Sequence, residues 1–433
     1  MGNVAALSRG EPQGASSATG HSRTDNGFDP TLLQSDGFVS RFTSYLFRHP
    51  LAVFKFLRRW WPIPNLFGWA AITRFDDVAE AMQNDKAVAT PFGPKMKDLA
   101  AGPNFVLGMA DSDEYQAMHH EIMRVYPPED NDAIIAPFSY QEAHRLVNEG
   151  EGKIDGIGGL LILIPILICE KYYGLRVEDK AGFARWTIAM SSYMFGDPAN
   201  DPKIKEAAFA AAALVRPIVD EAIDRAQAGP TEDTIIARFV QRQKEAPEAM
   251  PDNVLRAIML GMITGFVPTN TMASGHVLEL LLSNPDWMRQ ARAAAIADDD
   301  DLLAGCLFEA MRFWPINPGP FRVAGEDFVV AAGTRREKLI TKGTNMIVST
   351  QSAMHDPRRV EDPGTFNPHR EQTNSMLLGF GLHWCIGAPL ARAQITQTFK
   401  ALLKRDNVRR APGKEGKMTK LGPFPENLWV LYD

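Results

Sequence analysis

The feature that most constrains the fold is the apolar stretch from Pro251 to Pro285, PDNVLRAIMLGMITGFVPTNTMASGHVLELLLSNP. Over about 30 residues, apolar side chains fall on nearly every side of a helical wheel, whereas a surface helix has one apolar stripe. A helix of this kind needs protein on most of its sides. The sequence therefore predicts a helix-rich fold built around a buried central helix.

Helical periodicity also dominates residues 140–292, and strand-like patterns occupy residues 321–350. Near the start, residues 68–85 predict a short strand followed by a helix that begins at Asp76 or Asp77. We therefore expect a mainly α fold with a smaller β region.

Composition limits the class of protein. The 433 residues include 45% hydrophobic residues and carry a formal net charge of −6, so bulk charge gives a nucleic-acid role no support. Residues 1–27 are polar and small and predict a disordered tail. No linker is visible afterwards, and residues 28–433 are expected to form a single domain.

Three cysteines, Cys169, Cys306 and Cys385, are too few for a disulfide framework. We expect a soluble, cytoplasmic protein with packed thiols at Cys169 and Cys306. The run LLILIPILIC, residues 160–169, is shorter than the roughly 20 residues that span a bilayer. It predicts a buried segment.

Residues 47–64, FRHPLAVFKFLRRWWPIP, mix basic and aromatic side chains. Such a segment can lie in the headgroup layer of a membrane. It can equally form a surface helix whose apolar side packs on the core. The sequence leaves both interpretations open, the first giving a weak peripheral membrane contact.

Two features inside helices suggest a specific role. Pro268 sits in the middle of the central helix, where it removes a backbone donor and should kink the helix. The kink can serve packing, or it can open the helix where it passes a ligand. Glu309 and Arg312 are three residues apart among apolar neighbours, which indicates a buried ion pair.

The segment LLGFGLHWCIGAPLARAQ, residues 377–394, places Cys385 just before a helix that starts near Ala388. Glycines at Gly379, Gly381 and Gly387 permit tight turns and a close approach of backbone to a ligand. The helix N-terminus favours thiolate over thiol. A thiolate there can bind a metal or act as a nucleophile, whereas a buried inert cysteine would not need the glycines.

His383, Cys385 and Gly387, following Gly381, resemble the heme-binding loop of the cytochrome P450 superfamily. The Glu309–Arg312 pair resembles its ExxR motif at the right spacing. The resemblance extends from about Gly68 to the C-terminus. It implies a cytochrome P450-like fold, with heme b (iron protoporphyrin IX) between the kinked central helix and the cysteine loop.

By this resemblance, Cys385 is the axial thiolate ligand of the heme iron. His383 and Arg322 match positions that bind the heme propionates. Tyr115 and His119, in DEYQAMHHEIMR, fall where the family has a histidine and an arginine for the same task. A shifted alignment would place His120 or Arg124 there instead.

The loop and the ExxR motif each show one departure from the family. Leu378 stands where the family has a phenylalanine seven residues before the cysteine. Thr365 stands where the family has the arginine that partners the Glu309–Arg312 pair, and His369 or Arg370 can substitute for it.

The central helix departs further. The family has a small residue, a glycine, any residue, an acid and a threonine, where this chain has TGFVPTN at residues 264–270. With Gly265 as the family's glycine, the acid becomes Val267 and the alcohol becomes Pro268. Thr269 then comes one residue late, although a kink could bring its hydroxyl or the Asn270 amide over the iron.

Because Val267 and Pro268 cannot relay protons, the leading hypothesis is chemistry on oxygen that is already reduced. The enzyme would be a peroxygenase or an isomerase of lipid hydroperoxides. The C-terminal stretch, residues 407–433, resembles the heme-thiolate domain of fungal fusions of the linoleate diol synthase type. A fatty-acid derivative would then be the substrate.

The alternative is an oxygen-dependent monooxygenase that receives electrons from a separate redox partner. A third hypothesis is a non-catalytic ligand-binding relative. For either enzyme, the expected pocket is apolar and predicts a lipophilic substrate. Its walls would be Phe105, Val106, Leu107, Phe266, Val267 and Phe321.

Overall fold

The computed structural model describes residues 50–229, 232–248, 250–373 and 375–433, so the predicted tail at 1–27 lies outside the described residues. The helices are α2 (Pro50–Trp60), α3 (Phe75–Met82), α4 (Gly93–Ala100), α5 (Asp113–Val125), α6 (Ala136–Glu149), α7 (Leu163–Ile168), α8 (Lys180–Ser191), α9 (Pro202–Ala228), α10 (Ile235–Glu245), α11 (Asp252–Ser283), α12 (Pro285–Ile296), α13 (Asp300–Phe313), α14 (Thr350–Ala353) and α15 (Ala388–Leu403).

The strands are short. They are β1 (Asn65–Leu66), β2 (Trp69–Ile72), β3 (Val88–Ala89), β4 (Lys153–Asp155), β5 (Phe321–Ala324), β6 (Phe328–Val330), β7 (Lys338–Ile340), β8 (Asn345–Val348), β9 (Arg409–Arg410), β10 (Lys420–Leu421), β11 (Phe424–Pro425) and β12 (Trp429–Leu431). The largest sheet has the order β1-β2-β8-β5-β3, in which β2 and β8 are parallel and the other pairs antiparallel. The prediction of a mainly α fold with a smaller β region is confirmed.

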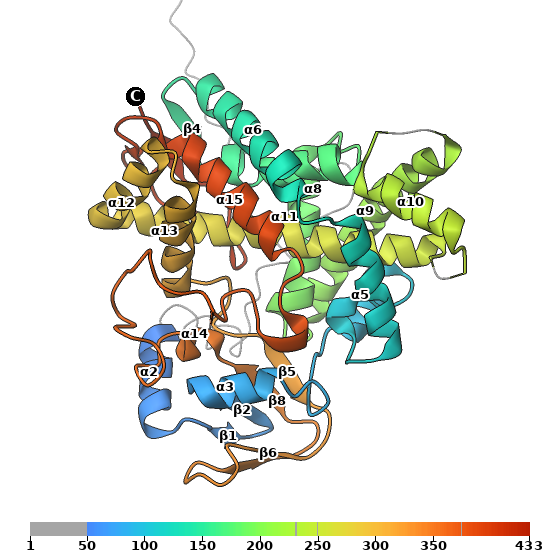
Figure 1. Ribbon diagram of the computed structural model, residues 1–433, viewed down its shortest axis with the longest axis vertical. Coiled ribbons are helices and arrows are strands. Elements are labelled where there is room, and N and C mark those ends of the chain that lie inside the picture. The colour runs from blue at the N-terminus through green and yellow to red at the C-terminus, as the bar shows by residue number, and fades with distance from the viewer. Residues whose placement is uncertain (1–49, 230–231, 249, 374) are drawn as a thin grey trace, which may run out of the picture.

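The central helix is α11, and it crosses the helical part of the molecule beneath α15 (Figure 1). Most of its side chains are buried, because α4, α8, α9, α13 and α15 pack around it. This burial confirms what its apolar surface predicted. The helix runs without interruption through Pro268, so the proline does not break it.

The β region has a smaller core of its own. Ile72, Val78 and Val348 meet there, on β2, α3 and β8. Helix α3 begins at Phe75 with Asp76 and Asp77 in its first turn, in agreement with the predicted start. This region packs below the helical part (Figure 1) and carries β5, which supplies one wall of the site described below.

The apolar run at 160–169 is buried as predicted, and forms α7 with short π-helical turns at Ile157–Leu161 and Cys169–Tyr173. Within the described residues, no helix has both the length and the apolar character needed to cross a membrane. Residues 50–60 of the basic, aromatic segment form α2, while 47–49 lie outside the described residues. Helix α2 buries Phe54 and Arg58 and leaves Phe56 and Trp60 exposed.

Candidate functional site

The cysteine loop is a tight turn held by its own backbone. The Cys385 N–H donates to the carbonyl oxygen of Leu378 at 2.9 Å, and the Cys385 carbonyl accepts from Ala388 N–H at 3.1 Å. Gly387 precedes α15, which begins at Ala388. The sequence thus places the sulfur immediately before a helix, as predicted.

Two glycines in the loop are required by geometry. Gly379 and Gly381 have positive φ values of 91° and 71°, which side chains other than glycine rarely adopt. A Cβ atom on Gly381 would lie 2.4 Å from the carbonyl oxygen of Met82. The loop can therefore approach α3 only with glycine at this position. Gly387 has an ordinary φ of −87° and acts through its N–H instead.

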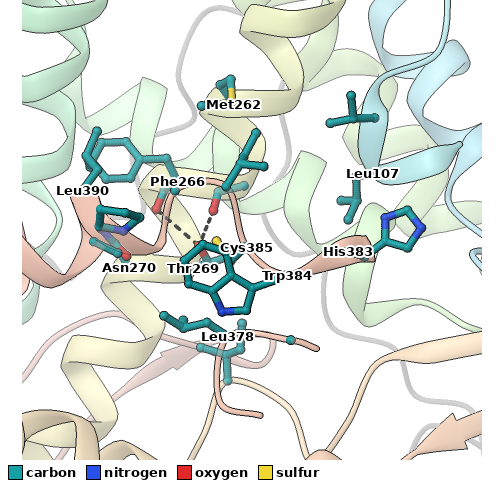
Figure 2. Close-up of a pocket in the computed structure, with 18 of the residues that line it drawn as sticks. Leu107, Met262, Phe266, Thr269, Asn270, Leu378, His383, Trp384, Cys385 and Leu390 are labelled. Atoms are coloured by element: carbon teal, nitrogen blue, oxygen red, sulfur yellow. Dashed lines mark hydrogen bonds between the residues drawn. The ribbon is translucent and has the colours of Figure 1, made fainter. Parts of the chain in front are cut away.

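Cys385 faces a cavity of about 340 Å³ between the loop, α11 and β5. Thr269 and Phe266 of α11 line this cavity together with Trp384 and Leu378 of the loop (Figure 2). The predicted walls Phe105, Val106, Leu107, Phe266 and Phe321 all line it. Val267 does not, which corrects that prediction, because its side chain lies on another face of α11.

The face of α11 that meets the cavity consists of Gly261, Met262, Gly265, Phe266, Thr269, Asn270 and Ala273. Pro268 and Val267 fall outside this set. The Thr269 hydroxyl donates to the carbonyl oxygen of Gly265, four residues earlier (Figure 2). Its oxygen remains able to accept a hydrogen bond from a group in the cavity.

The spacing of Gly265 and Thr269 also fits a second alignment of the family pattern, in which the small residue and the threonine are four apart. In that alignment Gly265 is the small residue and Thr269 is the alcohol. Phe266 then replaces the family's glycine, and Pro268 replaces the acid.

Asn270 lines the cavity, but its amide is already engaged. The Asn270 Nδ2 donates to Gln394 Oε1 on α15 at 2.7 Å. Gln394 Nε2 in turn donates to the Thr398 hydroxyl at 2.9 Å. Asn270 therefore links the two helices that carry the site.

One edge of the cavity holds a buried cation. Arg322, on β5, is 5% exposed and donates to the carbonyl oxygen of Phe321 at 2.9 Å. No carboxylate among the described residues lies within ion-pair distance of its guanidinium. Burial lowers the pKa of Arg322 to about 10, and the charge of nearby Asp85 partly offsets this shift. A buried arginine without an ion pair is suited to an anionic ligand.

His383 lies at the same edge, with its Nε2 3.8 Å from an Asp85 carboxylate oxygen. Burial, and then the charge of Arg322, lower the pKa of His383 to about 4. Burial raises the pKa of Asp85. Arg322, His383 and Asp85 therefore lie in a poorly hydrated part of the cavity edge. A carboxylate bound there would change the balance of charge among these three groups.

Tyr115 and His119 of α5 stand behind this edge. The Tyr115 hydroxyl donates to the carbonyl oxygen of Leu382 at 2.9 Å, and its ring stacks on His119 at 5.6 Å between centroids. Tyr115 lines the cavity, whereas His119 is not among the residues that line it. His120 and Arg124, the alternatives from a shifted alignment, are exposed.

The thiol of Cys385 is accessible from the cavity, and the cavity itself lies within the protein. Burial raises the pKa of Cys385, and a hydrogen bond from the Gly387 N–H partly offsets the shift. The hydrogen bond from the backbone therefore favours the thiolate, as predicted, but burial has the larger effect and favours the thiol. Cys169 and Cys306 are buried among apolar side chains, as predicted for packed thiols.

Glu309 and Arg312 form the buried pair predicted from the sequence, with contacts of 2.6 and 2.9 Å. Arg370 supplies the third member, since its Nε donates to Glu309 at 3.2 Å, while His369 is exposed. His355 joins the cluster: Arg312 Nη1 donates to its Nε2 at 3.0 Å, so its Nδ1–H donates to Gln351 O at 2.9 Å. Sequence reasoning missed His355, because it lies 43 residues from Arg312.

The residues of this site fit a planar group that has a metal ion at its centre, held by one protein ligand, and negative charges at its edge. Cys385 would hold the iron, and Arg322, His383 and Tyr115 would hold the propionates. These features define a heme-thiolate protein. When bound, a thiolate-ligated heme supplies the activation of oxygen.

Comparisons with known proteins agree. Residues 189–424 match the family model described as Cytochrome P450, which is more than half of the chain. The chain belongs to the cytochrome P450 family.

Two curated relatives and one solved structure are informative. The chain is 28% identical to Cytochrome P450 monooxygenase PikC of Streptomyces venezuelae, over 59% of this chain and 57% of that protein. It is 24% identical to Mycinamicin IV hydroxylase/epoxidase of Micromonospora griseorubida, over 77% and 81%. The fold matches CYP109E1 from Bacillus megaterium in complex with testosterone, with a TM-score of 0.76, 18% identity and coverage of 89% and 98%.

Proposed function

We propose that this protein is an oxygen-dependent monooxygenase that hydroxylates or epoxidises a lipophilic small molecule. It would bind heme b through Cys385 and receive electrons from a separate redox partner. The relatives described above include a monooxygenase and a hydroxylase/epoxidase.

The observation that carries this proposal is the position of Thr269. Its hydroxyl lies on the cavity face of α11, donates to Gly265 and can accept a hydrogen bond from a bound group. An alcohol in this place can hold a water molecule or pass a proton toward the cavity. The argument for peroxide chemistry depended on the absence of an alcohol at this place in the helix. Because Thr269 supplies one, that argument no longer applies.

The hypothesis of a peroxygenase or hydroperoxide isomerase is not supported by the comparisons, and neither is the resemblance to fungal diol synthases. Pro268 still occupies the acid position. Proton delivery would then depend on Thr269 together with water in the cavity, rather than on a carboxylate of α11.

The cavity supports a lipophilic substrate. Aromatic and aliphatic side chains from α5, α11, α13, β5 and the cysteine loop form much of its wall. Phe92 and Phe195, which both line the cavity, meet edge to face at 5.5 Å between ring centroids. Burial of apolar substrate surface against these rings would supply most of the binding free energy.

The test is isotopic. The purified protein, loaded with heme, is given a surrogate ferredoxin and reductase, NADPH and a panel of lipophilic compounds under ¹⁸O₂. A monooxygenase incorporates one ¹⁸O atom into each product molecule. Product that forms only with added peroxide, and never with the reductase, would reject the proposal.

We also propose a weak peripheral contact with anionic membranes through α2 and the adjoining turn. Phe56, Trp60 and Phe67 are 62%, 70% and 98% exposed, and Lys55 and Arg59 lie on the same helix as the first two. Exposed aromatic side chains beside basic ones favour a headgroup layer. Co-sedimentation with phosphatidylglycerol vesicles should fall when Phe56 and Trp60 are replaced by serine. Equal sedimentation of both proteins would exclude this contact.

A further inference from the structure

Three tyrosines that the proposed function does not use form a cluster beside the candidate site. Tyr126 follows α5, and Tyr172 and Tyr173 end the π-helical turn after α7. The ring centroid of Tyr126 lies 5.9 Å from that of Tyr172 and 6.0 Å from that of Tyr173. The centroids of Tyr172 and Tyr173 are 6.1 Å apart. All three line the same cavity as Cys385.

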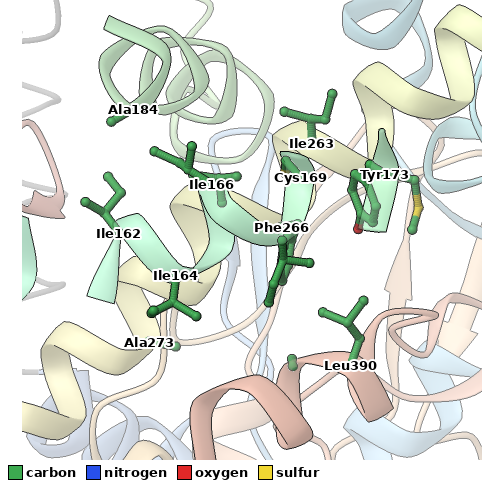
Figure 3. Packing of buried hydrophobic residues seen from close by; sticks show 14 of the residues in the cluster. Ile162, Ile164, Ile166, Cys169, Tyr173, Ala184, Ile263, Phe266, Ala273 and Leu390 are labelled. Atoms are coloured by element: carbon green, nitrogen blue, oxygen red, sulfur yellow. The ribbon is translucent and has the colours of Figure 1, made fainter. Parts of the chain in front are cut away.

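The inner end of the cluster is Tyr173. Its ring lies 5.9 Å from that of Phe266, on the cavity face of α11. Figure 3 shows Tyr173 packed with Cys169 and Phe266. Burial raises the pKa of Tyr173 and of Tyr126. Tyr173 lines the same cavity as Cys385, the ligand of the proposed cofactor.

The outer end is Tyr172, and it has a proton acceptor. Its hydroxyl donates to Asp130 Oδ2 at 2.6 Å, and Arg238 Nη1 donates to the same oxygen at 2.5 Å. Arg238 also binds Asp233, whose side chain is 71% exposed. The chain of contacts thus passes from the cavity to the surface.

A phenol gives up an electron more readily when its proton has an acceptor at hydrogen-bonding distance, because the oxidised phenol is a strong acid. Burial raises the pKa of Tyr172 well above its usual value, so the phenol is protonated at neutral pH. Its proton can move along the existing hydrogen bond to Asp130. While the phenol remains protonated, the positive charge of Arg238 would balance the negative charge of the Asp130 carboxylate.

We propose that Tyr173, Tyr126 and Tyr172 carry oxidising equivalents from the heme cavity to the surface when peroxide enters without substrate. This inference rests on the proposed function, because it requires the heme. It gives the protein a second activity, the reduction of peroxide at the expense of a one-electron donor in solution.

Hydrogen peroxide takes up two electrons and two protons, and its O–O bond breaks to give two molecules of water. The two electrons reach it through the cluster, one at a time. Each time, Tyr172 loses an electron and passes its proton to Asp130. A donor such as ascorbate then returns one electron to Tyr172, which regains its proton from Asp130, and the donor releases one proton to the solvent. The solvent supplies the two protons that peroxide consumes, so two donor molecules are oxidised for each peroxide.

The test uses the heme-loaded protein without substrate, mixed rapidly with hydrogen peroxide. One sample is frozen for electron paramagnetic resonance, and another receives ascorbate. The variants are Tyr172→Phe, Tyr173→Phe and Asp130→Asn. The control is Tyr140→Phe on α6, whose ring lies beside Lys400 and Lys404 and outside the cavity.

We expect the wild-type protein and the control to form a tyrosyl radical and to oxidise ascorbate at equal rates. Both Tyr→Phe variants of the cluster should oxidise ascorbate severalfold more slowly and should bleach their heme faster. Asp130→Asn keeps the phenol and removes its proton acceptor, so it should also be slow, with a larger solvent deuterium effect. A purely structural cluster would change none of these rates in a folded variant.

Equal ascorbate oxidation and bleaching in the wild-type protein and all three variants would overturn the proposal. A thiolate-type heme spectrum in the same samples would show that the proposed function stands regardless. A wild-type protein that binds no heme would overturn both proposals together.

Discussion

At the scale of single residues, the buried charge of Arg322 indicates a binding site for an anionic ligand. Its guanidinium is buried on β5 without an ion pair among the described residues. A propionate would turn this unfavourable burial into a charge-assisted hydrogen bond.

Replacing Arg322 by methionine should accelerate heme loss. A hydrogen bond to a charged group contributes about 1.5–3 kcal/mol, and its loss corresponds to roughly tenfold to a hundredfold faster dissociation. Transfer of heme to an excess of apomyoglobin measures the rate. Arg336→Met is the control, because Arg336 pairs with Asp77 outside the cavity. Equal rates for both variants would mean that Arg322 does not hold the heme.

His355 predicts a dependence of stability on pH. Burial, and then the charge of Arg312, lower the pKa of His355 to about 3 in the folded protein. The unfolded value is about 6.5, so below that pH the unfolded chain binds a proton that the folded protein does not. His355 therefore destabilises the fold progressively as the pH falls from about 6.5 toward 3, by at most about 1.4 kcal/mol per pH unit.

The measurement is urea unfolding of the wild-type protein and His355→Gln at about pH 7 and about pH 5. Other histidines contribute equally to both proteins, so the difference between them isolates His355. The variant should lose less stability between the two pH values. Parallel losses would show that His355 is protonated in the folded protein.

The residue scale also shows what a linear motif leaves open. With Gly265 as the family's glycine, Thr269 comes one position late, and with Gly265 as the small residue, Thr269 takes the alcohol position. A linear pattern cannot show which residues share a helix face, whereas the structure places both Gly265 and Thr269 at the cavity. Tyr126 and Tyr172 were missed for another reason, since their contact joins segments 46 residues apart whose pairing no local pattern encodes.

At the scale of elements, the sequence was more informative. The apolar surface of α11 predicted its burial, and the glycine-rich segment before Ala388 predicted a turn leading into α15. These features are local and depend on composition and periodicity. The link between the two helices, Asn270 to Gln394, was not predictable, because either amide alone is compatible with many partners.

That link should contribute measurably to stability. Asn270→Leu leaves the Gln394 amide buried without its donor, which costs about 1–3 kcal/mol. Adding Gln394→Met removes the second polar group, so the double variant should lose less than the sum of the single losses. Denaturant unfolding of the four proteins gives the coupling energy. Strictly additive losses would show that the hydrogen bond does not join α11 and α15.

At the scale of the whole molecule, the cavity lies where α11, the cysteine loop and β5 meet. A heme bound there would contact both the large helical core and the smaller β region. Binding to the folded state alone stabilises that state by mass action.

Heme removal should therefore lower the unfolding temperature and loosen specific segments. Hydrogen exchange should accelerate in residues 376–390 and at the start of α15, while α12, none of whose residues lines the cavity, changes little. Mass spectrometry of the loaded and heme-free protein provides the comparison. A uniform acceleration through the chain would indicate global unfolding instead of local loosening.

The most direct test of the central claim, that Thr269 serves oxygen activation, is the stoichiometry of NADPH to product. The heme-loaded wild-type protein and Thr269→Ala are given the same surrogate reductase and the same accepted substrate. We predict that most NADPH consumed by the wild-type protein appears as oxygenated product, and that Thr269→Ala consumes NADPH at a similar rate but releases hydrogen peroxide. Equal coupling in both proteins would contradict the assignment of Thr269.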